Sequence, residues 1–270
     1  MTITLKSTVS SSDSKLNGAI VTVKNTMTNE TQTQTWMGTP LVFKIPTVNT
    51  YTVSASSVIG YATPVELSYT ASVGTSRAVE MVYKYVPVGI YIYDTDGNFT
   101  KLDDWNTANN GKAVGVSVRT ENSMFVIAPT YDSESKKWGG SGTTISGIVT
   151  STDSVTAKKD YAGELNTDKI IAQIGISNAP AVEYCRNYTF KNGKKGYLWS
   201  LGEAWDAYNN NEEINAAMSK IGGTAITTEG YHWTSTQYSS SEAWALIWDQ
   251  SYVISIGKEW VNCVRAVCAF

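Results

Sequence analysis

The sequence predicts an α+β chain of two domains, a β-sandwich over residues 1–86 and a mixed domain over residues 87–270. Short runs of Thr, Ser, Val and Tyr, separated by turn residues, fill the first part. Patterns typical of helices, and all but one of the nine tryptophans, occur in the second. In the last forty residues, 231–270, regularly placed apolar residues alternate with chemically unrelated side chains.

The composition limits the classes of function. The chain has 270 residues, 42% hydrophobic and 17% charged, which is enough to bury a sizeable core in one or two domains. A net charge of -3 and a pI near 5.3 provide no basic field for phosphate backbones, so we expect no nucleic-acid partner. No apolar run approaches the roughly 20 residues that span a bilayer, so we expect no membrane insertion.

The N-terminus and the cysteines bear on the place of folding. Residues 1–6 have neither the basic region nor the long apolar region of a secretory signal. We therefore expect no signal peptide in this chain: either the protein is made without Sec export or a signal has been removed. Cys185, Cys263 and Cys268 are too few and odd in number for a disulfide framework, which fits a reducing place of folding.

Residues 1–86 are expected to form seven strands. Strand-like runs rich in β-branched and aromatic residues occur at 20–23, 41–45, 51–55 and 79–83. Turn residues separate such runs at roughly 8–12 residue intervals, which is typical of a sandwich. Pro87 cannot donate a hydrogen bond to a sheet, so we predict the domain boundary there.

Helices enter the pattern after Val88. Strands are predicted at 89–93 and 123–129, a turn at 94–98, a loop at 139–142, and helices near 161–174 and 179–188. Ser200 and Glu203 form a capping box that starts a further helix, because each side chain can bond the backbone N–H of the other residue. Three asparagines at 209–211 are expected to split this helix, and Gly222 and Gly223 to end it.

The tail is best understood from the alternation of side chains along a strand. Trp244, Leu246 and Trp248 share one face, which leaves Ala245, Ile247 and Asp249 on the other. A face of Ala, Ile and Asp is typical of neither a solvated surface nor a core. A turn is expected at residues 251–252, a return strand from Val253, a loop at 257–259 and a central strand at 264–267, where Arg265 is expected to have a structural rather than a ligand-binding role.

A fixed frame and a mixed filling can be separated in the tail. The frame consists of Trp233, Thr234, Ser235, Thr236, Ala243, Trp244, Leu246, Trp248, Val253, Val264, Arg265, Ala266 and Val267. The filling consists of Glu242, Ala245, Ile247, Asp249, Tyr252, Ile254, Ser255, Ile256, Gly257, Glu259, Trp260, Val261 and Asn262. A core requires one chemistry, whereas a recognition surface can use any, so the filling residues are the predicted ligand-binding residues.

The order of several motifs resembles a known family. The motifs are residues 196–203 (GYLWSLGE), 214–217 (INAA), 221–223 (IGG), 233–238 (WTSTQY), 243–244 (AW) and 264–267 (VRAV). Residues 88–270, in which they occur, resemble the variable proteins of diversity-generating retroelements. The resemblance implies a C-type-lectin-like fold with a variable region at about 231–270. It also implies that the protein is a phage-tail or bacterial-surface receptor for a host-cell surface protein or glycan. Whether it is a monomer or a homotrimer is left open.

The genetic code refines this expectation. In that family, adenines of the variable region are altered during reverse transcription. Randomised Asn codons can give Ala, Ile, Asp, Tyr, Ser, Gly, Val and Asn, but not Glu or Trp. Glu242, Glu259 and Trp260 therefore need another adenine-bearing codon, or they are fixed. Residues 46–51 separately resemble a hairpin of Ig-like and PEGA-like modules, so residues 1–86 are expected to be an Ig-like spacer or docking domain.

Two other functions remain open. The first is a structural module, a fimbrial or decoration protein in which a lectin-like fold serves assembly. The second is an enzyme, because Cys263 to Cys268 resembles the paired-cysteine strand of the copper-binding formylglycine-generating enzymes. On a regular strand, residues five apart point to opposite faces and lie about 16 Å apart, so a bulge would be needed to bring the two thiols together.

Catalytic and metal-binding residues are not predicted. His232, the only histidine, is expected to be a packed or surface imidazole rather than a general base. Residues 94–98 (DTDGN) lack the spacing of a calcium loop and are expected to form a hairpin turn. We therefore expect a non-catalytic binding protein without a cofactor or a metal.

Overall fold

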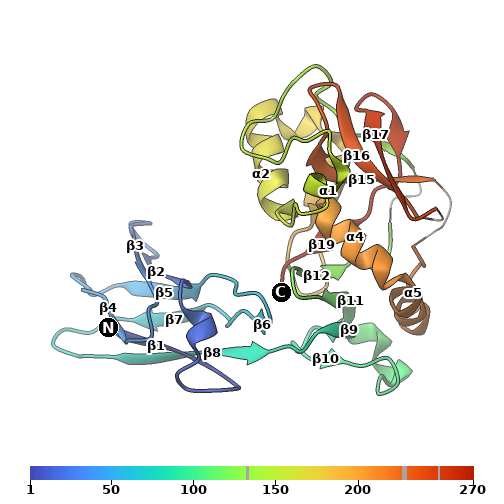
Figure 1. Ribbon diagram of the computed structural model, residues 1–270. Coiled ribbons are helices and arrows are strands. Elements are labelled where there is room, and N and C mark those ends of the chain that lie inside the picture. Colours follow the sequence, from blue (N-terminus) through green and yellow to red (C-terminus); the bar gives the residue numbers. More distant parts are fainter. Residues whose placement is uncertain (132–133, 227–229, 249) are drawn as a thin grey trace. The chain divides into compact units, whose positions relative to one another are not determined.

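The computed structural model describes residues 1–131, 134–226, 230–248 and 250–270. The chain divides into two compact units, Met1–Pro87 and Val88–Ala269 (Figure 1). In the described part of the chain, no helix is both long enough and apolar enough to cross a membrane.

The N-terminal unit is a β-sandwich of eight strands, all of them in described residues. One sheet has the order β4-β1-β8-β6, formed by β4 (Leu41–Val42), β1 (Thr2–Ser7), β8 (Ala78–Tyr85) and β6 (Tyr61–Ala62). The other has the order β3-β2-β5-β7, formed by β3 (Thr31–Thr35), β2 (Ile20–Asn25), β5 (Thr50–Ala55) and β7 (Leu67–Thr70). The sandwich is confirmed, with one strand more than expected. Its first strand is formed by the N-terminal residues and pairs in parallel with β8.

Alternating burial shows why these segments are strands. In β1 and β8 every second side chain is buried, which places Ile3 and Leu5 of β1 opposite Val79 and Met81 of β8. A short 3-10 helix, η1 (Ser14–Leu16), adds Leu16 to the same core.

The main sheet of the C-terminal unit has the order β10-β9-β11-β12-β19-β14. Its strands are β10 (Phe99–Thr100), β9 (Gly89–Asp94), β11 (Ala113–Arg119), β12 (Met124–Ile127), β19 (Ala266–Cys268) and β14 (Tyr197–Leu198). The closing strand was expected at 264–267, but only its last two residues lie in β19, which nevertheless has a strand on each side. Sequence analysis did not identify β11, although all seven of its residues are buried.

Helices pack around this sheet. Helices α2 (Gly163–Ile174) and α3 (Pro180–Asn187) contact β14, and α5 (Asn211–Lys220) contacts β9 and β11. Short elements in the connections are η2 (Thr107–Lys112), α1 (Ser154–Ala157), η3 (Ile176–Asn178) and the strands β13 (Lys136–Lys137) and β18 (Val261–Asn262). The helices predicted near 161–174 and 179–188 are thus confirmed as α2 and α3. The split is also confirmed, because α4 (Leu201–Asn209) ends where α5 begins.

The tail forms a separate antiparallel sheet of β15 (Tyr231–Gln237), β16 (Glu242–Ile247) and β17 (Tyr252–Gly257), drawn in orange to red in Figure 1. Helix α4 packs against β15 and β16. The pairing of β15 with β16 shifts register between Trp233 and Gln237. The intervening Thr234, Ser235 and Thr236 are fully buried. These residues connect the tail sheet to the rest of the unit.

The capping box at the start of α4 is confirmed and is deeply buried. The Glu203 carboxylate accepts hydrogen bonds from the backbone N–H of Ser200 at 2.8 Å and from the Tyr197 hydroxyl at 3.0 Å. Burial removes water from this carboxyl and raises its pKa to about 8. Burial therefore favours the protonated form of Glu203 in the folded protein.

The first prediction concerns close packing in β11. A Cβ on Gly115 would clash with the backbone carbonyl oxygen of Ile127 on β12, whereas a Cβ on Gly111 would meet open space. Gly115→Ala is expected to lower the free energy of unfolding by about 2 kcal/mol, because overpacked cores must shift backbone. Gly111→Ala is expected to change it by less than about 0.5 kcal/mol. Urea unfolding followed by circular dichroism measures both, and equal stability of the two variants would contradict the prediction.

The second prediction concerns pH. The pKa of Glu203 is higher in the folded chain than in the unfolded chain, so its contribution to stability is complete below about pH 4.5 and is lost as the pH rises toward 8. Between pH 5 and 8 the wild type is expected to lose on the order of 3 kcal/mol that Glu203→Gln does not lose. The exposed Glu212→Gln is the control and should follow the wild type. Parallel pH profiles of wild type and Glu203→Gln would refute the assignment.

Candidate binding surface

One face of the tail sheet carries an apolar stripe. Tyr231 lies opposite Ile247, and Ile247 lies opposite Tyr252. Because directly opposed residues of antiparallel strands share a face, the three side chains form a row across the sheet. Ile254 and Ile256 continue along β17 on the same face. We call these five residues the apolar stripe.

The stripe is accessible to solvent. Tyr231 and Tyr252 are 42% and 56% exposed, and Ile247, Ile254 and Ile256 are each half-buried. A row of large apolar side chains at this exposure leaves a substantial apolar surface in contact with water, which is characteristic of interaction sites.

The opposite face of the tail sheet belongs to the core. His232, Leu246 and Val253 are opposed across the three strands, and all are buried. Just beyond β16, Trp248 stacks on Trp199 with the ring centroids 6.0 Å apart. Trp244, Leu246 and Trp248, which alternation placed on one face, are all buried.

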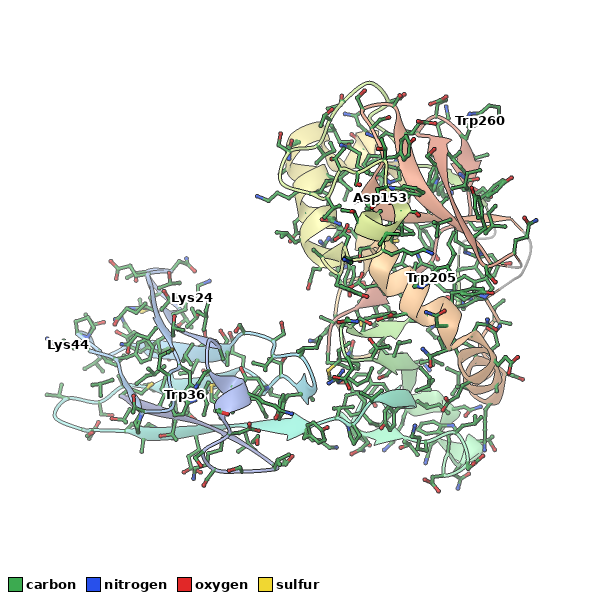
Figure 2. All side chains as sticks on the ribbon, in the orientation of Figure 1. Lys24, Trp36, Lys44, Asp153, Trp205 and Trp260 are labelled. Carbon is green, nitrogen blue, oxygen red and sulfur yellow. The ribbon has the colours of Figure 1, made fainter. Side chains whose placement is uncertain are left out.

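A second exposed group follows β17. Trp260 and Val261 are 64% and 55% exposed, and Figure 2 shows Trp260 at the periphery of the C-terminal unit. The neighbouring Glu259 is also exposed, and its carboxylate accepts a hydrogen bond from the Ser141 hydroxyl at 3.3 Å. A Cβ on Gly257 would contact the Trp260 indole, so this turn folds back toward the end of β17.

The predicted ligand-binding residues separate by exposure. The exposed ones are Tyr252, Glu259, Trp260 and Val261, and the half-buried ones are Glu242, Ile247, Ile254, Ser255, Ile256 and Gly257. Two lie beneath the surface, contrary to the expectation. Ala245 has no exposed area, because it lies between Trp233 and Ile254 of the flanking strands, and Asn262 is buried where β18 pairs with β13. Asp249 lies outside the described residues.

Lys258 anchors the turn that bears Trp260. Its side chain is fully buried, and its Nζ donates to the carbonyl oxygens of Thr143 and Ser240, each at 2.9 Å, and to Oε1 of Gln237 at 2.8 Å. The ammonium also lies 4.5 Å from the centre of the Trp138 ring. Burial lowers the pKa of Lys258 to about 8. The sequence showed only an isolated lysine among filling residues, which gave no signal of this role.

A buried polar network holds the connecting segment 234–236. One carboxylate oxygen of Asp160 accepts hydrogen bonds from the Thr236 hydroxyl at 2.7 Å and from the Asn166 amide at 2.8 Å. The same amide donates to the Ser235 hydroxyl at 3.2 Å. The network therefore links the tail sheet to α2, which carries Asn166. Sequence analysis identified the threonines and the serine as frame but missed Asp160.

Arg265 has the structural surroundings that the sequence predicted. It is buried, donates from Nη2 to the Thr224 carbonyl oxygen at 2.8 Å, and lies over the Tyr131 ring at 5.2 Å. Burial lowers its pKa to about 10.

Of the residues considered for catalysis, His232 and Cys268 are buried and Cys263 is half-buried. His232 lies 5.6 Å from Trp248, measured between ring centroids. Burial raises the pKa of Cys263, and it raises that of Cys268 to about 12, which favours neutral thiols over the thiolates that copper binding would require. All three cysteines are free.

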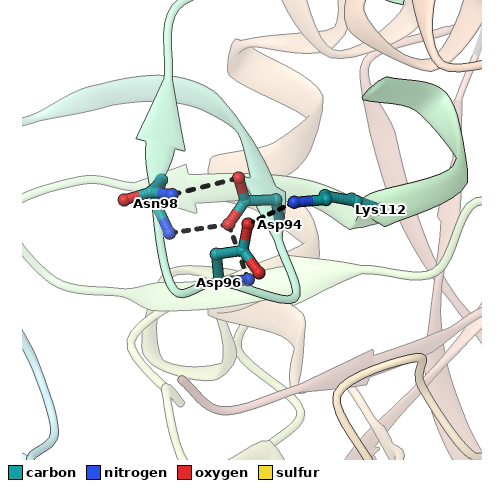
Figure 3. Close-up of polar contacts among 4 residues, drawn as sticks. All are labelled: Asp94, Asp96, Asn98 and Lys112. Carbon is teal, nitrogen blue, oxygen red and sulfur yellow. Dashed lines mark hydrogen bonds and ion pairs between the residues drawn. The ribbon is translucent and has the colours of Figure 1, made fainter. Parts of the chain in front are cut away.

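The turn at 94–98 is held by its own side chains, as Figure 3 shows. Oδ1 of Asp94 accepts hydrogen bonds from the backbone N–H groups of Asp96 and Asn98 at 2.9 and 2.8 Å. The Asp96 carboxylate is paired with Lys112 at 2.7 Å. The carboxylates thus stabilise a hairpin between β9 and β10. Within the described ranges, no group of three or more His, Cys, Asp or Glu residues could hold a metal ion.

Comparisons with known proteins give a fold without a family. No protein-family model and no curated protein matches the chain. Among solved structures, the chain is similar to a fimbrial protein from Bacteroides ovatus, with a TM-score of 0.55 and 10% identity over 100% of this chain and 69% of that one. A pilus-presented adhesin is aligned over 97% of this chain and 69% of its own, at 12% identity, but the TM-score of 0.23 is too low to support an argument. The protein thus has an α+β fold with an N-terminal β-sandwich, similar to that of a fimbrial protein.

Proposed function

We propose that this protein is a non-catalytic surface adhesion protein whose C-terminal unit recognises a host-cell surface protein or glycan through its tail. One observation carries the proposal. All of the framing residues of the tail are buried, whereas ten of the twelve described filling residues lie at or partly at the surface. The tail therefore separates residues that maintain the fold from residues that can contact a partner.

The chemistry of the exposed residues suits recognition. Binding sites use a few large side chains as anchors, surrounded by adaptable polar groups. Tyr252 and Trp260 are exposed aromatic anchors, while Ile254 and Ile256 provide apolar area beside them. Glu259 contributes a charge next to Trp260, beyond the C-terminal end of β17.

The finer part of the proposal concerns origin and variation. We propose that the scaffold is C-type-lectin-like and that residues 231–270 are the variable region of a diversity-generating retroelement protein, displayed on a phage tail or a bacterial surface. The burial of the frame supports this, because changes at exposed positions would leave the core intact. The N-terminal unit would then serve as an Ig-like spacer or docking domain.

A second candidate is a structural fimbrial or decoration module. Similarity to a fimbrial protein over the whole length of this chain favours it, since that similarity includes the sandwich as well as the tail. Sequences of the same locus from several isolates separate the two candidates. Substitutions concentrated at the exposed filling positions support recognition, and an even spread supports assembly.

An enzymatic function is less consistent with the site. The single histidine is packed against Trp248, and burial raises the pKa of the Cys263 and Cys268 thiols, which favours their neutral form. Both features favour a packing role over acid–base or metal chemistry.

The third prediction tests the anchors. Replacing both Tyr252 and Trp260 with Ala is expected to weaken binding by at least about tenfold to any cell or glycan that binds the wild type. The reason is that aromatic anchors buried in a complex dominate interface energies. Binding of fluorescently labelled protein to a glycan panel and to intact bacterial cells measures the effect. The matched control replaces Val65 and Val73, which are 81% and 86% exposed in the N-terminal unit, with Ala.

The control variant should bind like the wild type. Unchanged binding of the Tyr252 and Trp260 double variant, with its circular dichroism spectrum intact, would contradict the assigned surface. A wild type that binds no target but forms fibres would favour the structural candidate.

A further inference from the structure

The outer edge of β17 is open. The strand pairs with β16 through an unbroken register from Glu242 and Gly257 to Ile247 and Tyr252, and it is the last strand of its sheet. Among the described residues, no other segment donates a hydrogen bond to residues 252–256 or accepts one from them. Its outward N–H and C=O groups are therefore available to a further strand.

The sequence of β17 lacks the features that usually prevent edge pairing. Natural edge strands are protected by lysines, prolines, bulges or very short length. Residues 252–257, YVISIG, contain no charge and no proline, and four of the six are β-branched or aromatic residues. The unbroken register also shows that the strand has no bulge.

Other strand edges of the C-terminal unit are covered or very short, and the edge strand β10 has only two residues. The free side of β15 is covered by Cys263, which exchanges backbone hydrogen bonds with Tyr231 and Trp233 at 2.9 and 3.0 Å. β13, which pairs only with β18 in the described structure, has just two residues, both lysines. At β14, the Leu198 N–H donates to the Thr167 hydroxyl at 3.1 Å. Among these edges, β17 is the longest one left unpaired in the described structure.

We propose that β17 pairs antiparallel with β17 of a second copy of this chain, which forms a twofold dimer with a sheet continuous across both copies. An uncharged strand brings no like charges together when it meets itself, and an identical edge is self-complementary about a twofold axis. Antiparallel pairing also places the two Glu259 side chains at opposite ends of the interface, because Glu259 follows the C-terminal end of the strand.

The pairing has a consequence for the apolar stripe. Opposed residues of antiparallel strands share a face, so the stripes of the two copies lie side by side on the same side of the joined sheet. Each copy then contributes half of a larger apolar surface. This extension of the binding surface rests on the proposed function, whereas the dimer does not. A single self-pairing edge forms a dimer and does not by itself form a homotrimer, which the sequence left open.

The fourth prediction is tested by molar mass in the absence of any ligand. Light scattering after size-exclusion chromatography and sedimentation velocity should give twice the 29.4 kDa of one chain at tens of micromolar protein, and one chain on dilution. Ile254→Lys introduces a charge on the edge strand at a half-buried position and is expected to give one chain at every concentration. The matched control, Val261→Lys, adds the same charge at an exposed position of β18 and should remain a dimer.

Two further measurements exclude trivial explanations. Equal amounts of Ile254→Lys and Ile254→Glu, when mixed, should recover the double mass, because opposite charges then face each other across the interface. Ser255→Lys, on the same edge, replaces the test if Ile254→Lys does not fold. The pairing is overturned if the wild type has the mass of one chain at all concentrations. It is also overturned if the dimer persists in both edge-strand variants, Ile254→Lys and Ser255→Lys. If such a monomer still binds its target, the binding surface stands without the dimer.

Discussion

The structure of the C-terminal unit depends on how the buried segment 234–236 is held. The register of β15 shifts there, so these residues cannot all pair with β16 and need other partners. The Asp160 carboxylate, the Asn166 amide and the backbone carbonyl of Trp199 provide them. A buried polar group without a partner costs roughly 1–3 kcal/mol, so the segment is stable only when this set is complete. These hydrogen bonds attach the tail sheet to the interior of the unit.

This buried attachment separates the residues that stabilise the tail from those on its exposed surface. The tail sheet is attached to the interior of the unit by three buried side chains, those of Trp199, Trp248 and Lys258. The residues of the apolar stripe instead lie opposite neighbours on the strands of the tail sheet itself. Substitutions at half-buried surface positions generally cost much less than those in a core. A surface of this kind can change its chemistry while the fold persists, which is the property that a diversified adhesin requires and a catalytic site does not.

The sequence predicted elements best where local signals were strong. The capping box at Ser200 and the apolar periodicity of α2 and α3 placed these helices to within two residues at each end. The strand β3 gave no such signal, because its sequence TQTQT has no apolar face. Its glutamines contribute hydrogen bonds: the amides of Gln32 and Gln34 donate to the carbonyl oxygens of Lys44 and Val42. β11 is buried on both faces, and its Gly115 obscured its strand pattern. Long-range hydrogen bonds, such as those of Asp160 and Lys258, leave no local signal.

The lack of a local signal for long-range contacts also explains why alternation predicted most, but not all, of the exposed tail positions. Ala245 lies on the same face of β16 as Ile247, but its side chain is fully buried. It is on the central strand of the sheet, with Trp233 on one side and Ile254 on the other. Alternation along a strand assigns a residue to a face of the sheet. Whether its side chain reaches solvent there depends on the position of the strand within the sheet and on the size of the flanking residues. A larger residue at 245 would have to displace Trp233 or Ile254, at a cost typical of overpacked cores. The size of side chain that each position can accommodate is therefore expected to depend on strand order as well as on alternation: it is largest on the edge strand β17 and smallest at the centre of β16.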